Sequence, residues 1–319
     1  MPLLDVDCWS SDPALADLCQ GRLARRADGA PARIGTEIFL LDATCRGWEA
    51  PALWDVSQGL TSRELETTLE HAGLRGFYHH EGPSWQFYDP VLKVGVHTLP
   101  SPMAIPPWES GSPLRLFLHW AYAHAGMRLT HAGTLGIGGV GALIVGASGS
   151  GKSGTTLAGL LNGLESAGDD YVLLEGGEDP TAHAVFRVFK QDSSGLRRVG
   201  LDPGRVGATA VNWQGKHEVD AQALNPSGFV NRLSIRSILA PELARLDRTL
   251  IEPLSAAKAA LALAPSGVLQ LQGDTREGFR FFAELTRRLP AFRVRLSEDP
   301  VEIADAIGNH LIREVATAS

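Results

Sequence analysis

A glycine-rich turn at residues 146–153 carries the residue types that bind nucleoside polyphosphates. Gly146, Gly151, Lys152 and Ser153 complete the pattern G-x-x-x-x-G-K-[ST]. In this pattern the backbone N–H groups face the phosphates, the lysine reaches the β- and γ-phosphates and the serine hydroxyl binds Mg²⁺. The alternative is a glycine-rich turn without a ligand. The residues predicted to bind ATP are Gly146, Ala147, Ser148, Gly149, Ser150, Gly151, Lys152, Ser153 and Gly154.

Two further carboxylates stand one predicted helix beyond this turn. Asp169 and Asp170 follow Lys152 at the point where the chain should return to a sheet. Adjacent carboxylates near bound phosphates can have separate roles, because one can hold the metal while the other accepts a hydroxyl proton. A solvated Asp-Asp turn is the alternative. Glu175, which ends the apolar run YVLLE, is a second candidate for the acid that such proteins place at a strand end.

The segments on both sides of the turn have the order that a phosphate loop requires. The apolar residues ALIV, 142–145, are typical of a short buried strand, and leucines follow the turn with the i, i+3, i+4 and i+7 spacing of a helix face. These leucines are Leu157, Leu160, Leu161 and Leu164. The second glycine pattern, GIGGVG at 136–141, precedes the strand instead of following it. It therefore predicts a hairpin turn rather than a dinucleotide-binding loop.

Composition sets limits on the class of protein. The 319 residues are 44% hydrophobic, which is enough for two domains or for one domain with a large extension. The formal net charge of −7 argues against a nucleic-acid partner, since binding to phosphate backbones needs clustered Lys and Arg. No apolar stretch reaches the roughly 18 residues that span a bilayer, so we expect a cytoplasmic protein without a membrane partner. Cys8, Cys19 and Cys45 are too few and too dispersed to suggest disulfides or a cysteine metal site.

The order of the predicted elements suggests two domains. A stretch rich in proline and serine, 99–113, is the predicted linker, so that residues 1–112 form a mixed α/β domain and residues 113–319 the catalytic domain. The second part alternates strand-like and helical segments, which favours the α/β class. Lys216 and Arg236, near two of its predicted strands, are candidate contacts for phosphate or substrate, with solvated surface charges as the alternative.

Residues 130–174 resemble the HPr kinase/phosphorylase family, whose P-loop core is akin to that of ATP-dependent phosphoenolpyruvate carboxykinase. His131 and the Asp169–Asp170 pair stand where that family has a histidine ahead of its loop and an Asp-Asp pair behind it. The resemblance implies that Asp169 deprotonates a substrate hydroxyl, that Asp170 assists the metal and that His131 lies near the transferred phosphate. From the residues alone, His131 is an ordinary structural histidine. The family's glutamate after the P-loop serine is replaced by Gly154, and its downstream glycine-rich signature has no good match.

The resemblance implies a kinase core of that P-loop type, with ATP and Mg²⁺, acting on a serine hydroxyl of a protein or peptide. Several divergent relatives look like kinases that modify ribosomally made precursor peptides, including lasso peptides, and a homo-oligomer is plausible on the same ground. The N-terminal domain is then a candidate for peptide recognition through Trp85, Phe87, Tyr88 and Trp108, with core packing as the alternative. Two other functions stay open: a kinase of a small hydroxylated metabolite, and a nucleotide-sensing module that transfers no phosphate.

Overall fold

The chain divides into two compact units. The computed structural model describes residues 4–24, 34–42, 61–80, 83–101, 104–204, 211–267, 271–273 and 275–318, so Cys45 lies outside the described residues. Unit 1 comprises Met1–Gly126 with Leu271–Asp274, and unit 2 comprises Met127–Gln270 with Thr275–Ser319. The division falls later in the chain than the proline-rich stretch at which the sequence places it. The reason is that helix α3 (Arg115–His124) packs on the sheet of unit 1.

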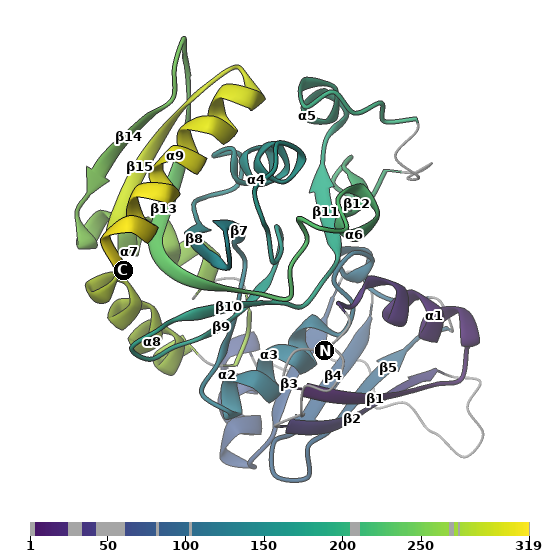
Figure 1. The fold of residues 1–319 in the computed structure, drawn as a ribbon. Helices are drawn as coiled ribbons and strands as arrows, with labels where there is room; N and C mark the ends of the chain where they lie inside the picture. Colours follow the sequence, from purple (N-terminus) through teal and green to yellow (C-terminus); the bar gives the residue numbers. More distant parts are fainter. Residues whose placement is uncertain are drawn as a thin grey trace. The chain divides into compact units, whose positions relative to one another are not determined.

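Unit 1 is built on a five-stranded sheet with the order β1-β2-β5-β4-β3 (Figure 1). Its strands are β1 Leu4–Ser10, β2 Ile34–Asp42, β3 Arg75–His79, β4 Ser84–Asp89 and β5 Val94–Leu99, and its other helices are α1 Pro13–Arg22, α2 Ser62–His71 and the short η2 Pro107–Glu109. Strands β1, β2 and β5 run parallel, whereas β3, β4 and β5 form an antiparallel meander. Thr61 and Glu64 form the capping box that begins α2, in keeping with the TSRE sequence.

The aromatic residues considered above for peptide recognition contribute to the packing of unit 1. Trp85 and Tyr88 are buried, and Phe87 and Trp108 are half-buried. The rings of Trp85 and Phe87 stack with centroids 5.1 Å apart, and Trp108 lies against His79. Buried and stacked rings of this kind stabilise a core, so the core-packing alternative describes them better than an exposed recognition surface.

Unit 2 is built on an eight-stranded mixed sheet in which β13 is central. Its strands are β6 Arg128–Thr130, β7 Gly133–Ile137, β8 Val140–Ile144, β9 Val172–Glu175, β10 Thr181–Ala184, β13 Arg232–Leu246, β14 Leu250–Leu254 and β15 Ala291–Ser297. Strands β8 and β15 both pair with β13 in parallel, so all three end at the same edge of the sheet. A separate two-stranded sheet joins β11 (Val188–Gln191) to β12 (His217–Asp220).

Helices α4, α7, α8 and α9 lie around the eight-stranded sheet, whereas α5 and α6 lie near β11 and β12 (Figure 1). They are α4 Lys152–Leu161, α5 Ser193–Arg198, α6 Ala221–Leu224, α7 Ala256–Gly267, α8 Thr275–Arg288 and α9 Pro300–Ala318. Helices α4 and α9 pack together, and one core cluster joins Ile303, Ile307 and Leu311 of α9 to Ile144 of β8 and Leu239 of β13. No helix in the described parts of the chain combines the length and the apolar character needed to cross a bilayer.

The hairpin predicted from GIGGVG is confirmed. Strands β7 and β8 pair antiparallel, and the turn between them consists of Gly138 and Gly139 at φ of 58° and 81°. Glycine reaches this region without the steric cost of a Cβ atom. The hairpin delivers β8 directly into the glycine-rich loop, which positions that loop at the edge where the parallel strands end.

Candidate functional site

The predicted phosphate loop, residues 146–153, connects the end of β8 to the beginning of α4, so the strand, loop and helix occur in the expected order. Gly151 occupies the N-cap of α4 at φ 103°, and a Cβ atom there would lie 2.9 Å from Leu296 Cδ1. No side-chain hydrogen bond caps this helix end. Its first N–H groups, together with the positive end of the helix dipole, therefore face the loop and can receive an anion.

Lys152 points back into the loop that precedes it. Its side chain is buried, and its Nζ donates hydrogen bonds to the carbonyl oxygens of Gly146, at 2.7 Å, and Ala147, at 3.1 Å. Burial lowers the pKa of Lys152, the carboxylates of Asp169 and Asp170 oppose that change, and the neighbouring charge of Lys216 adds to it. The loop thus holds an ammonium group close to two carboxylates.

Asp169 is a buried carboxylate with one oxygen to spare. It is 2% exposed, and its Oδ2 accepts a long hydrogen bond of 3.5 Å from the backbone N–H of Lys190. Its Oδ1 has no hydrogen-bond partner among the described residues. Burial, aided by the charge of Asp170, raises the pKa of Asp169 to about 6, although a hydrogen bond from the Ser153 hydroxyl opposes the rise. A carboxylate of this kind is suited to accept a proton.

Asp170 lies between two basic side chains. Its Oδ1 is 3.0 Å from His131 Nε2, and its Oδ2 accepts a hydrogen bond of 2.6 Å from Lys190 Nζ. Burial opposes the ionisation of Asp170, but the Lys190 ammonium and His131 outweigh it and hold the pKa of Asp170 well below its usual range. We call His131, Asp170 and Lys190 the Asp170 cluster. The two adjacent aspartates therefore have opposite pKa shifts, which suits them to different chemical roles.

Lys190 is the site residue that sequence reasoning missed. It stands at a buried position in β11, in the segment VFKQ, which belongs to no recognisable motif. The low number of lysines is the one hint in the sequence: the chain has only five, so each is a candidate for a specific role. Three of them, Lys152, Lys190 and Lys216, gather around the phosphate loop and the two aspartates.

Two other candidates from the sequence lie elsewhere. Glu175 is at the opposite end of β9 from Asp170, where its Oε2 is 3.2 Å from His183 Nε2. Arg236 donates a hydrogen bond of 2.8 Å to Asp179 and does not line the cavity beside the loop. Of the two cationic candidates, only Lys216 is brought to the site.

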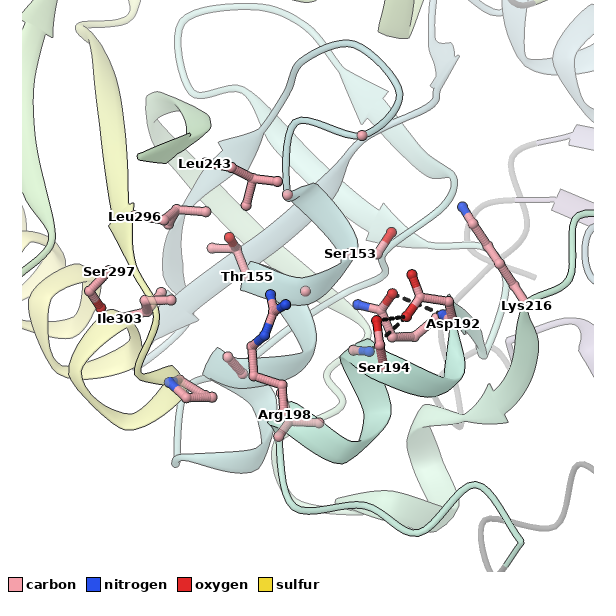
Figure 2. A pocket seen from close by; sticks show the side chains of 18 of the residues that line it. Ser153, Thr155, Asp192, Ser194, Arg198, Lys216, Leu243, Leu296, Ser297 and Ile303 are labelled. Atoms are coloured by element: carbon pink, nitrogen blue, oxygen red, sulfur yellow. Dashed lines mark hydrogen bonds between the residues drawn. The ribbon is translucent and has the colours of Figure 1, made fainter. Parts of the chain in front are cut away.

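A cavity of about 320 Å³ opens beside the loop and the first turns of α4 (Figure 2). Ser153, Arg198 and Lys216 line its polar side. Its other side is formed where β13 and β15 end and where α9 begins, at Leu243, Leu296 and Ile303. Its volume is at the lower end of the range for small-molecule sites.

The donor groups near the loop fit Mg²⁺ better than a metal enclosed by protein ligands. Among the described residues, no three His, Cys, Asp or Glu side chains come close enough together to hold a metal ion. The hydroxyl of Ser153 and the carboxylates beside it are hard oxygen ligands, and Asp169 Oδ1 is a buried oxygen without a partner in the described part of the chain. Mg²⁺ usually binds one or two such groups and takes its remaining ligands from phosphate and water.

Comparison with known proteins adds little to this geometry. No protein-family model matches the chain, and none of the curated proteins matches it. Among solved structures, the Hpr(Ser) kinase/phosphatase from Coxiella burnetii is similar, with 14% sequence identity over 60% of this chain and 97% of that one and a TM-score of 0.31. A likeness of this size does not identify a family, so the function must be argued from the site itself.

Proposed function

We propose that this protein is an ATP- and Mg²⁺-dependent kinase that transfers the γ-phosphate to a serine hydroxyl of a protein or peptide. One observation carries the proposal. The P-loop lysine lies close to Asp169, a buried carboxylate with a raised pKa and one oxygen that has no partner among the described residues. A phosphate-binding loop requires only the lysine, whereas transfer to a hydroxyl also requires a proton acceptor.

In the proposed reaction, Asp169 accepts the proton of the attacking hydroxyl. The serine oxygen bonds to the γ-phosphorus while the bond from that phosphorus to the β,γ-bridging oxygen breaks, and ADP leaves. Lys152 and the N–H groups of the loop and of α4 balance the charge on the phosphate oxygens. Because the transition state of phosphoryl transfer has little covalent demand, positioning and charge stabilisation account for most of the catalysis.

The Asp170 cluster places an ionised carboxylate and its basic partners beside Asp169, the proposed proton acceptor. Asp170 stays ionised between His131 and Lys190, so its negative charge helps to raise the pKa of Asp169. Ser153 and Asp170 are the groups that would hold Mg²⁺, and Asp170 would share its carboxylate with the two basic side chains. When bound, Mg²⁺ neutralises charge on the β- and γ-phosphates.

The class of acceptor rests on the resemblance of residues 130–174 to HPr kinases, and the site itself requires only a hydroxyl. The experiment is to incubate the protein with γ-³²P-ATP and Mg²⁺ in an extract of the source cells, and then to separate polypeptides from small molecules. Label on phosphoserine of a polypeptide supports the proposal. Label on a small molecule makes the protein a metabolite kinase instead.

A variant that removes the ammonium group provides the control. Lys152→Ala should reduce transfer by about a thousandfold, because it removes the cation that stabilises charge on the transferred group. Its thermal unfolding should stay cooperative. If nucleotide binds but neither the wild-type protein nor any extract yields labelled product, the protein is a nucleotide sensor rather than a kinase.

A further inference from the structure

We propose that Cys8 and Cys19 of unit 1 are an oxidation site, at which exchange with a small-molecule disulfide such as glutathione disulfide forms a reversible internal disulfide. This inference goes beyond the proposed function, and its failure would leave that function standing. The two thiols are not bonded to each other in this structure. Cys19 follows Cys8 by eleven residues, a spacing that suggests no pairing by itself, so the fold must bring them together.

The turn between β1 and α1 returns Cys19 to Cys8. Asp12 caps α1, since its side chain accepts a hydrogen bond of 2.7 Å from the backbone N–H of Ala14. Helix α1 therefore begins shortly after the strand ends, and it packs against that strand (Figure 1). Leu15 and Cys19 are its buried residues, and their spacing of four places them on one helix face. The packed face of α1 thus carries a thiol.

Cys8 provides the second thiol from the strand. It is half-buried, whereas Asp7 and Trp9 on either side of it are exposed, as the alternation of side chains along a strand requires. Its thiol and that of Cys19 form a hydrogen bond with each other. A disulfide requires two cysteines whose Cβ atoms lie close and point toward each other. Thiols that already touch can meet this requirement through small side-chain rotations.

The surroundings of the two thiols give them different roles. The hydrogen bond that Cys19 donates lowers the pKa of Cys8, although burial opposes that change. The same hydrogen bond raises the pKa of Cys19, as do burial and the charges of Cys8 and Glu109. Because the thiolate is the reactive form and Cys19 is only 3% exposed, Cys8 is the thiol that meets the oxidant.

The exchange has two steps. In the first, the Cys8 thiolate attacks one sulfur atom of glutathione disulfide, whose S–S bond breaks, and the first glutathione leaves and takes up a proton. In the second, Cys19 loses its proton and its sulfur bonds to the sulfur of Cys8. The bond between Cys8 and glutathione then breaks, and the second glutathione leaves with that proton. The protein loses two electrons, which glutathione disulfide gains, and an excess of glutathione reverses both steps.

The test is a redox titration of the full-length Cys45→Ser variant, in which Cys8 and Cys19 are the only thiols. The variant is equilibrated with mixtures of glutathione and glutathione disulfide, both folded and unfolded in urea, and then quenched with acid. Intact mass measures the disulfide fraction, because the disulfide form lacks two hydrogen atoms. We expect the folded protein to reach half oxidation at a ratio [GSH]²/[GSSG] at least about tenfold higher than the unfolded chain, since folding holds the thiols together. Equal midpoints overturn the inference.

Two matched variants test the roles of the thiols. Cys19→Ser and Cys8→Ser, each combined with Cys45→Ser, leave one thiol, whose rate of mixed-disulfide formation with glutathione disulfide is measured by mass. We expect Cys8 to react at least about tenfold faster than Cys19, because it is more exposed and more readily ionised. A faster reaction at Cys19 overturns these roles. A peptide map of the oxidised wild-type protein should show Cys8 linked to Cys19, and a link from either one to Cys45 overturns the pairing.

Discussion

Each unit of this protein buries a cluster of ionisable side chains, and the two clusters differ in kind. In unit 1, Gln86 donates to Glu109 at 2.9 Å and lies 3.2 Å from His97 Nδ1, while its Oε1 is 3.1 Å from His79 Nε2. We call His79, Gln86, His97 and Glu109 the Glu109 cluster. None of its buried polar side-chain atoms lacks a partner within the described residues. In unit 2, Asp169 lies beside the Asp170 cluster, and its Oδ1 has no hydrogen-bond partner among the described residues.

The charge states differ in the same way. Burial lowers the pKa of His79 to about 4 and that of His97 to about 3, and it raises the pKa of Glu109, so burial favours the neutral form of all three groups. Asp170 instead stays ionised, because Lys190 and His131 face it. A cluster whose histidines are neutral and whose polar atoms are paired internally is suited to stabilising a fold, whereas one that keeps its charges beside an unpaired oxygen is suited to binding a ligand.

The largest expected effect tests whether that unpaired oxygen is used. Asp169→Asn should reduce phosphoryl transfer by about a thousandfold, because the amide cannot accept the hydroxyl proton, while the Kd for ATP changes little. Single-turnover transfer from γ-³²P-ATP measures the first quantity and calorimetry the second. Glu175→Gln, at the opposite end of β9, is the control and should keep full activity. An active Asp169→Asn variant would remove the functional difference between the clusters.

A smaller effect is expected from changing the charge of each cluster. Lys190→Met removes a cation from a largely buried ion pair and should lower the free energy of unfolding by about 3 kcal/mol. Glu109→Gln replaces a carboxyl whose pKa is raised with a neutral group of the same shape, and should change that free energy by less than about 1 kcal/mol. Urea denaturation at pH 7 measures both. Equal losses in the two variants would show that the clusters do not differ in charge.

The last comparison is a pH dependence of stability that comes from the Glu109 cluster. The folded-state pKa values of His79 and His97 lie below the ordinary value of 6.5. Below pH 6.5 the unfolded chain therefore binds protons at these histidines that the folded chain does not bind. Stability is therefore full above pH 6.5 and falls as the pH drops toward 4, by up to about 1.4 kcal/mol per pH unit for each histidine. The raised pKa values of Glu109 and of Asp169 act in the opposite sense and reduce the loss.

Urea midpoints between pH 7 and pH 4.5, followed by tryptophan fluorescence, measure this slope. His97→Gln should flatten it, because one of the two histidines that resist protonation is gone. A His97→Gln variant with the same slope as the wild-type protein would contradict the neutral state assigned to His97.

The sequence predicts the parts of the site that lie on one continuous segment. The glycine-rich loop, the helix behind it and the hairpin ahead of it are local patterns, and the structure has a hairpin, a loop and a helix in that order between residues 133 and 161. The same segment extends to Asp169 and Asp170, whose distance from Lys152 follows from the length of one helix. Local spacing determines these positions because no distant pairing is needed to establish them.

The rest depends on contacts between segments that are remote in the chain. Lys190 meets Asp170 only because β11 lies beside the start of β9, and the short segment VFKQ contains nothing that foretells this. The apolar side of the cavity likewise needs the register of β13 against both β8 and β15. The two compact units divide after helix α3, because a proline-rich segment indicates a break in regular structure and not the packing of the helix that follows it.

If the proposed function holds, the hydrogen bonds from Lys152 to the carbonyl oxygens of Gly146 and Ala147 weaken the binding of the nucleotide. The two carbonyl oxygens compete with the phosphate for the Lys152 ammonium group, because a phosphate oxygen must displace them before it can accept a hydrogen bond from Nζ. The measured affinity is then the difference between the new hydrogen bonds and the two that are given up. The same two hydrogen bonds pair the buried ammonium group with carbonyl oxygens, so the loop does not bury a bare cation.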